Sequence, residues 1–248
     1  MMSLSQKWTM TLEALIAEFA DLDNCPAVAI EGVSLDSRQV QPGDLFVAVK
    51  GLDTDGTAYI PQAVEHGAVA VLVEKDQHVA ELVESLIDDA NITVPVIAIE
   101  NLTEYVSDIA GTFYGQPSGA MAITGITGTN GKTTCSRLFA DLMEGLAGER
   151  AGTAAFIGTL GYGMVRNAAY RAPHDSAEPP ADQSAPSFAD KEQAGVTDTG
   201  LTTPDAVAMQ RILAELASKG AKHIALEVSS HSLVQRRVAG LKINIAVF

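Results

Sequence analysis

The feature that most constrains this chain is a strand, a glycine-rich turn and a helix in direct succession. Residues 120–126 form a short apolar run typical of a buried strand, and the turn at 128–134 follows it. Apolar residues then recur at helical spacing, namely Cys135, Leu138, Phe139, Leu142, Met143 and Leu146. Strands that alternate with helices in this way predict a mostly parallel sheet, so we expect an α/β fold.

The turn has the composition of a phosphate-binding loop. Its residues are Gly128, Thr129, Asn130, Gly131, Lys132, Thr133 and Thr134. Glycines let backbone N–H groups face an anion, and the start of the next helix adds positive potential. Lys132 can reach the outer phosphates of a nucleotide, and the Thr133 hydroxyl can ligate Mg²⁺. The general P-loop pattern has a glycine where this chain has Ile126, and a purely structural turn is the alternative interpretation.

A carboxylate at the end of a later strand is the second candidate for chemistry. Residues 223–228 predict a strand, and Glu227 lies at its carboxyl end, just before Ser229 and His231. Ligands of open parallel sheets bind at this edge, so Glu227 is a candidate metal ligand. The alternative for Glu227 is a solvated charge, and His231 is interpreted as a hydrogen-bonding residue.

A polar loop near the N-terminus is the third candidate. Leu35, Asp36, Ser37 and Arg38 precede a turn and a strand, and they can present hydroxyl, carboxylate and guanidinium groups to a polar ligand. A capped turn without a ligand is the alternative interpretation.

The rest of the chain predicts further alternation of helices and strands. Helices are expected at 12–19, 60–66, 101–114 and from Thr203 to Gly220, strands at 45–49, 69–73, 94–99 and 243–248, and a short helix or loop at 229–238. Asn101 and Glu104 have the spacing of a capping box, and Thr203 followed by Pro204 reads as a helix start.

Two segments interrupt this pattern. The sequence Gly-Gln-Pro-Ser-Gly at 115–119 predicts a boundary between domains 1–118 and 119–248. Residues 172–199 contain four prolines and six acidic residues with almost no large apolar side chain. Such a stretch cannot offset its ordering entropy by burial, so we expect a disordered surface insertion there.

Composition excludes several classes of protein. A hydrophobic content of 47% supports a buried core, and a net charge of −15 argues against a nucleic-acid partner. Cys25 and Cys135 are far apart and lie in no metal-binding pattern. No export signal and no apolar run of about 18 residues is evident. We therefore expect a cytoplasmic protein without a membrane span, and a monomer.

Taken together, the motifs resemble the Mur ligases, the ATP-dependent amide-forming enzymes of peptidoglycan synthesis. The loop at 127–133 matches that family's own variant of the phosphate loop, including the missing first glycine. The segments at 35–48, 201–205 and 227–238 are most similar to the members that add the third residue of the stem peptide. The resemblance implies an N-terminal uridine-binding α/β domain followed by part of a P-loop ATP-binding domain.

The resemblance also assigns roles to residues. Leu35 and Ser37 fall on positions that bind the uridine end of the nucleotide sugar. The positions that contact the muramoyl dipeptide are occupied by Thr202, Thr203, Ser229, Gln235 and Arg237. The loop 128–134 would bind ATP, with Lys132, Thr133 and Glu227 as catalytic residues and the last two as ligands of Mg²⁺.

The implied reaction transfers a phosphoryl group from ATP to the D-glutamate side chain of UDP-N-acetylmuramoyl-L-alanyl-D-glutamate. An amine of meso-diaminopimelate, or of L-lysine, then attacks the acyl phosphate. The family's C-terminal amino-acid-binding domain and its carbamylated lysine have no counterpart in these 248 residues, which alone are expected to be inactive. Another Mur or folylpolyglutamate-type ligase, or a non-catalytic nucleotide-sugar-binding module, are the alternatives.

Overall fold

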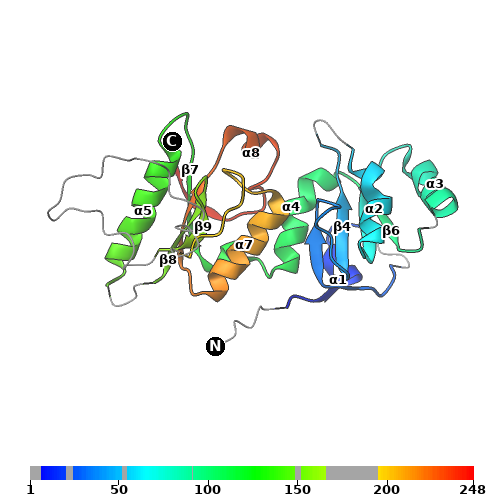
Figure 1. Cartoon of the computed structure of the whole chain (residues 1–248), viewed down its shortest axis with the longest axis horizontal. Coiled ribbons are helices and arrows are strands. Elements are labelled where there is room, and N and C mark those ends of the chain that lie inside the picture. The colour runs from blue at the N-terminus through cyan, green and yellow to red at the C-terminus, as the bar shows by residue number, and fades with distance from the viewer. Residues whose placement is uncertain (1–6, 21–24, 52–54, 91, 149–151, 166–194) are drawn as a thin grey trace. The chain divides into compact units, whose positions relative to one another are not determined.

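The computed structural model describes residues 7–20, 25–51, 55–90, 92–148, 152–165 and 195–248. They form two compact units, Met1–Gln116 and Pro117–Phe248, and each unit has its own sheet (Figure 1). The division falls just before the predicted boundary at 118. Both units combine helices with mostly parallel strands, so the predicted α/β class is correct.

The first unit is built on a parallel four-stranded sheet with the order β3-β4-β5-β6. Its strands are β3 (Gly32–Ser34), β4 (Asp44–Ala48), β5 (Ala70–Glu74) and β6 (Val96–Ile99), and a short antiparallel pair joins β1 (Met10–Thr11) to β2 (Ala29–Ile30). Its helices are α1 (Leu12–Ile16), η1 (Gly56–Tyr59), α2 (Ile60–Glu65), α3 (Val79–Ala90) and α4 (Leu102–Phe113). The strands expected at 45–49, 69–73 and 94–99 are thus β4, β5 and β6.

Both faces of this sheet are covered. Phe46, Val71 and Val73 pack in one core cluster with Ile60 of α2, while α4 contacts β3 and β5. Because neither face is exposed to water, β5 is a continuous apolar run and shows no alternation with polar residues.

The start of α4 differs from the sequence-based expectation. Asn101 adopts a left-handed conformation with φ of 55°, and its side chain makes no capping hydrogen bond. The first N–H groups of the helix instead donate to Glu74 at the end of β5, from Leu102 at 3.1 Å and from Thr103 at 3.3 Å. The predicted capping box is wrong because a carboxylate from a distant part of the sequence satisfies these donors.

The second unit contains a five-stranded sheet with the order β11-β7-β10-β8-β9. Its strands are β7 (Ala122–Ile126), β8 (Ala154–Gly158), β9 (Gly161–Met164), β10 (His223–Glu227) and β11 (Ile243–Val247). Its helices are η2 (Pro117–Ala120), α5 (Lys132–Leu146), α7 (Ala206–Ser218) and α8 (Ser230–Val234). All neighbours are parallel except β8 and β9, which form an antiparallel pair.

Helices α5 and α7 cover opposite faces of this sheet (Figure 1). Alternate residues of β10 show the division, because Ile224 and Leu226 pack with Met209 of α7 whereas Ala225 packs with Ala140 of α5. The strand period of two thus produces two separate cores from one buried strand.

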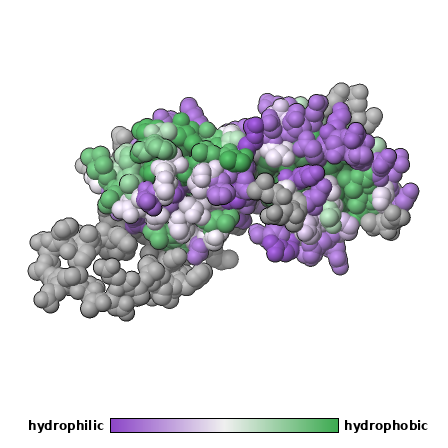
Figure 2. Space-filling view, turned by 90° about the horizontal axis from the view of Figure 1, so that it is seen from above, coloured by the Kyte–Doolittle hydropathy of each residue, from purple (hydrophilic) through white to green (hydrophobic). Residues whose placement is uncertain are grey.

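The apolar stripe predicted for α5 is only partly buried. Phe139 and Met143 pack against the sheet, but Leu138, Leu142 and Leu146 are exposed. Figure 2 shows extensive apolar surface over the unit that contains this helix. The sequence pattern correctly predicts a helix here, while the face turned to the sheet is set by small and polar residues such as Ser136 and Ala140. No described helix is long and apolar enough to cross a membrane.

Helix α7 begins later than predicted. Its N-cap is Asp205, whose side chain accepts hydrogen bonds from Val207 N and Ala208 N at 3.0 and 2.9 Å. Thr203 is therefore not the cap, because its hydroxyl is engaged elsewhere, as described below. Gly220 follows the helix with φ of 93°, in agreement with its predicted role as a terminator.

The predicted insertion at 172–199 lies mostly outside the described residues. Its last part, 195–199, is ordered against the second sheet, where Thr197 pairs with Tyr162 through two backbone hydrogen bonds of 2.9 Å. The disorder expected for these last residues is therefore wrong, because backbone pairing with Tyr162 supplies the contacts that their composition lacks.

Glu144, near the end of α5, provides a test of this packing. Its buried carboxylate accepts N–H groups from Gly152, Thr153 and Ala154 at the start of β8. Glu144→Ala leaves these donors without their acceptor and is expected to lower the free energy of unfolding by roughly 2–3 kcal/mol. Urea unfolding followed by circular dichroism measures the change. The same substitution at exposed Glu84 should change the free energy by less than about 0.5 kcal/mol, and equal effects at both positions would contradict this account.

Candidate functional site

Three neighbouring strand ends meet at one edge of the second sheet. Strand β10 lies between β7 and β8, and Glu227 pairs in register with Ile126 of β7. The glycine-rich loop leaves the end of β7, Glu227 ends β10, and Gly158 ends β8. Residues from three separate parts of the sequence therefore surround one position at the carboxyl edge of the sheet.

The glycine-rich loop has the backbone geometry of an anion-binding turn. Gly128 and Gly131 have φ values of 130° and 79°, which L-amino acids with side chains rarely adopt. Gly131 is also the N-cap of α5 and offers no side-chain cap, so the first N–H groups of this helix face the loop. The Lys132 ammonium donates to the Gly128 carbonyl oxygen at 2.8 Å, which holds it across the loop. This arrangement suits a phosphate group.

Glu227 is almost completely buried, with an exposed fraction of 1%. Its carboxylate accepts hydrogen bonds from the Thr133 hydroxyl at 2.9 Å, from the Ser136 hydroxyl at 3.4 Å, and from the backbone N–H and the hydroxyl of Thr159, both at 3.1 Å. The alternative of a solvated strand-end charge is therefore wrong, because the side chain is buried and four protein donors surround its carboxylate.

The surroundings of this carboxylate fit a divalent cation. Its four donors are all neutral, and none of the ion pairs recorded among the described residues includes Glu227. A buried negative charge without a cationic partner is costly, and an added cation would offset that cost. The oxygens of Glu227 and Thr133 are the ligand type that Mg²⁺ prefers. The described residues contain no group of three or more His, Cys, Asp or Glu side chains arranged to hold a metal, so a cation here would depend on Glu227, on hydroxyl oxygens and on its ligand.

Thr203, Ser229 and Arg237 form a connected group behind Glu227. The buried Thr203 hydroxyl donates to the backbone oxygen of Glu227 at 3.0 Å and accepts the Ser229 N–H at 3.1 Å. The Arg237 guanidinium donates to the Thr203 carbonyl oxygen at 2.7 Å. Ser229 also caps α8 by accepting the N–H of Ser232 at 3.2 Å. Three of the five residues predicted to contact the dipeptide are thus connected to one another by hydrogen bonds.

The other two residues predicted to contact the dipeptide, Thr202 and Gln235, lie outside this group. The Thr202 hydroxyl is 3.1 Å from the hydroxyl of Thr159, which connects it to Glu227. Gln235 follows α8 as its C-cap and is exposed, as is His231 within the helix. Thr202 therefore belongs to the network around the strand ends, whereas the Gln235 side chain makes no recorded hydrogen bond to the part of the chain that the structure describes.

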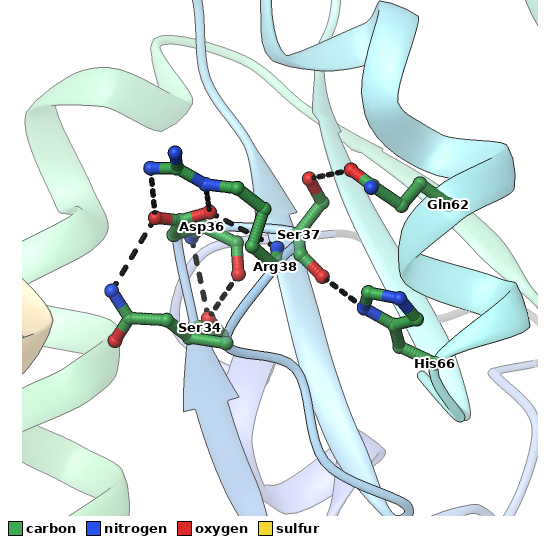
Figure 3. Close-up of polar contacts among 7 residues, drawn as sticks. Ser34, Asp36, Ser37, Arg38, Gln62 and His66 are labelled. Carbon is green, nitrogen blue, oxygen red and sulfur yellow. Dashed lines mark hydrogen bonds and ion pairs between the residues drawn. The ribbon is translucent and has the colours of Figure 1, made fainter.

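The polar loop of the first unit is held by its own contacts and by α2 (Figure 3). Arg38 pairs with Asp36 through Nε and Nη2 at 2.9 and 2.7 Å, and this hydrogen bonding holds the pKa of Asp36 below its ordinary value. The buried Ser37 hydroxyl donates to Gln62 Oε1 at 2.6 Å. His66 Nδ1 lies 2.7 Å from the Ser37 carbonyl oxygen, so that nitrogen carries the proton.

These contacts specify what the loop can offer to a ligand. The bidentate pairing of Asp36 with Arg38 neutralises both charges within the loop. Leu35 is half-buried, and Ser37 is tied to α2 through both its hydroxyl and its carbonyl. A loop fixed in this way presents a preformed surface, which reduces the entropy lost on binding.

Several residues of both sites escape reasoning from sequence. Thr159, Ser136, Gln62 and His66 carry no motif of their own, and each gains its role from a partner at least 25 positions away. The one available signal is the short apolar run at 154–157, which is not among the expected strands and which forms β8, because Thr159 then follows at the sheet edge where ligands bind.

Comparison with protein families agrees with the geometry of the site in the second unit. Residues 126–248 match the Mur ligase middle domain, and residues 29–114 match the catalytic domain of the Mur ligase family. The chain therefore belongs to the Mur ligase family.

The more particular similarity is to one kind of Mur ligase. The chain is 39% identical over 221 residues to the UDP-N-acetylmuramoyl-L-alanyl-D-glutamate–2,6-diaminopimelate ligase of Coxiella burnetii, covering 89% of this chain and 37% of that protein. It is 37% identical over 241 residues to the enzyme of the same name from Vibrio vulnificus, covering 97% of this chain and 41% of that protein. The chain thus spans well under half the length of these relatives.

Comparison with solved structures gives the same kind of ligase. A structure of a UDP-N-acetylmuramoyl-L-alanyl-D-glutamate–2,6-diaminopimelate ligase superposes with a TM-score of 0.62 and 26% identity, covering 96% of this chain and 39% of that one. MurF from Acinetobacter baumannii superposes with a TM-score of 0.51 at 17% identity, covering 90% of this chain and 36% of that one, which shows a common fold.

The two adjacent threonines provide a test of the geometry around Glu227. Thr203→Val keeps the shape of a buried side chain but removes the acceptor for the Ser229 N–H and the donor to the Glu227 carbonyl, so unfolding should become easier by about 1–3 kcal/mol. Thr202→Val is the matched control, because its hydroxyl is half-buried, and should cost less than about 1 kcal/mol. Urea denaturation measures both, and a larger loss for Thr202→Val would overturn the assignment.

Proposed function

We propose that this chain is the nucleotide-sugar-binding and ATP-binding part of an ATP-dependent ligase of peptidoglycan synthesis. The reaction joins meso-2,6-diaminopimelate to UDP-N-acetylmuramoyl-L-alanyl-D-glutamate. The observation that carries the proposal is the meeting of the glycine-rich loop with the buried carboxylate of Glu227, which lacks a cationic partner among the recorded ion pairs. The names of the relatives support these substrates and favour diaminopimelate over L-lysine.

The proposed reaction has two steps. The D-glutamate side-chain carboxylate attacks the γ-phosphorus of ATP, which forms an acyl phosphate and releases ADP. An amine of diaminopimelate then attacks the acyl carbon, loses a proton and displaces inorganic phosphate. Phosphoryl transfer of this kind depends mainly on positioning and on neutralisation of charge. The protein supplies both, and no side chain forms a covalent bond to the substrate.

The residues of the second unit take the following roles. The N–H groups of the loop 128–134 hold the phosphates, and the Lys132 ammonium moves from the Gly128 carbonyl to the transferring group. Thr133 and Glu227 hold Mg²⁺, which when bound neutralises charge on the phosphoryl oxygens. Arg237 supplies a fixed positive charge for the anionic peptide, which a chain of net charge −15 requires.

The first unit binds the uridine end of the nucleotide sugar in this proposal. Leu35 offers an apolar contact and Ser37 a polar one, on a loop held by Gln62 and His66 of the α2 region. The uridine end of the nucleotide sugar and ATP are therefore assigned to different domains, 1–118 and 119–248.

Lys132→Ala tests the nucleotide site. The variant should bind Mg·ATP at least about tenfold more weakly, because a charge-assisted contact to the phosphates is lost. Its affinity for the UDP-sugar dipeptide should be unchanged. Isothermal titration calorimetry on the 248-residue chain, with circular dichroism to confirm folding, measures both, and exposed Lys222→Ala is the charge-matched control. Equal loss of both ligands would contradict the separation of sites, and a folded wild-type chain that binds neither would contradict the proposed function.

Arg237→Ala tests the peptide end of the substrate. Loss of the guanidinium should weaken binding of the dipeptide-bearing nucleotide by about tenfold and leave binding of plain UDP unchanged, since UDP carries no peptide carboxylate. Competition titrations with the two ligands measure the difference. The control is Arg211→Ala on the exposed side of α7, which removes the same charge and should affect neither ligand. A similar effect of Arg237→Ala on both ligands would remove the assignment.

A further inference from the structure

We propose that Thr159 is a positioning residue that orients the Glu227 carboxylate for its metal ion and links it to the substrate loop at Thr202. The inference deepens the proposed function and rests on it. Thr159 lies directly after β8, and no motif in the sequence marks it.

The first observation is that Thr159 donates hydrogen bonds to both oxygens of the Glu227 carboxylate. Its backbone N–H donates to Glu227 Oε1 and its hydroxyl donates to Oε2, each at 3.1 Å. Two donors from one residue fix the rotation of the carboxylate about its last bond. Replacement of a residue that orients a metal ligand in this way typically lowers metal affinity by about 10–100-fold.

The second observation is that the residue directly before Thr159, Gly158, has no side chain. Gly158 ends β8, and a Cβ atom at that position would overlap the Glu227 side chain. The backbone of residues 158–159 therefore closes directly over the carboxylate, and only a glycine permits the hydrogen bond from the Thr159 N–H.

The other two donors cannot replace Thr159. Thr133 is itself assigned to the metal ion, so its hydroxyl oxygen is required by the cation. The Ser136 hydroxyl lies at 3.4 Å from Oε1 and also donates to the Thr133 carbonyl at 3.0 Å. Thr159 is therefore the group that holds both carboxylate oxygens independently of the metal ion.

The link to the substrate follows from the second contact of the same hydroxyl. Thr159 Oγ1 lies 3.1 Å from Glu227 Oε2 and 3.1 Å from the Thr202 hydroxyl, and it has a single proton to donate. When this proton goes to Oε2, the Thr159 oxygen can accept the proton of the Thr202 hydroxyl, so the two hydroxyls and the carboxylate form one chain of hydrogen bonds. The orientation of the Glu227 carboxylate is thus coupled to a residue assigned to the muramoyl dipeptide.

The test measures how strongly Mg²⁺ improves ADP binding. For the folded 248-residue chain, the ratio of ADP affinities with Mg²⁺ and with a chelator is obtained by calorimetry. Thr159→Val removes the hydroxyl and keeps the backbone N–H, so the ratio should fall about tenfold while metal-free ADP binding stays the same. A merely structural role would change the stability, or both affinities together.

Matched variants complete the test. Thr159→Ser retains the hydroxyl and should restore the ratio, and Thr153→Val at the opposite end of β8 should leave it unchanged. Thr159 is exposed, so Thr159→Ala serves as a second hydroxyl-free variant should the valine disturb folding. An unchanged ratio in a folded hydroxyl-free variant overturns the inference. A wild-type chain without Mg²⁺-dependent ADP binding would instead contradict the proposed function.

A second titration addresses the link to Thr202. With Mg·ADP present, Thr159→Val should weaken binding of the UDP-sugar dipeptide by about threefold, which corresponds to the loss of one neutral hydrogen bond, and leave UDP binding unchanged. Equal binding of the dipeptide ligand by both proteins would remove the link and leave Thr159 with the metal alone.

Discussion

The buried carboxylate of Glu227 is the constraint on which the second unit depends. A charged group with an exposed fraction of 1% persists only where donors surround it, and here they come from the glycine-rich loop, from α5 and from the turn after β8. These segments must therefore lie close together. The same requirement explains why β8 ends in a glycine.

Polar side chains also connect elements elsewhere in the chain. Glu144 joins the end of α5 to the start of β8, Glu74 caps α4 from the end of β5, and Gln62 ties α2 to the Ser37 loop. Each satisfies donors that would otherwise lose hydrogen bonds on folding. Ligand-binding loops held by such contacts are fixed before the ligand arrives, which lowers the entropic cost of binding. The proposed roles of Ser37 and Thr202 depend on this preorganisation.

Reasoning from sequence succeeds where the signal is local. Hydrophobic runs correctly predict β4, β5, β6 and β10, and the glycine-rich loop predicts both its own backbone and the helix that follows. It fails where a distant group competes. Asn101 and Thr203 both have the local chemistry of helix caps, but Glu74 and Asp205 take these roles, while the Thr203 hydroxyl bonds to the end of β10. The apolar stripe of α5 likewise predicts a helix without showing which side faces the sheet.

The sequence by itself determined the α/β class and the glycine-rich turn, and it indicated Lys132, Thr133 and Glu227 as candidate site residues, because short-range patterns encode strands, helices and turn geometry. Only the tertiary structure decided that Glu227 is buried among neutral donors, that the Thr203 hydroxyl donates to the backbone of Glu227, and that Thr159 donates to both oxygens of its carboxylate. The physical reason is that the order of strands in the sheet brings to the Glu227 carboxylate a hydroxyl that lies 94 positions away in the sequence. No local pattern records which strand ends become neighbours.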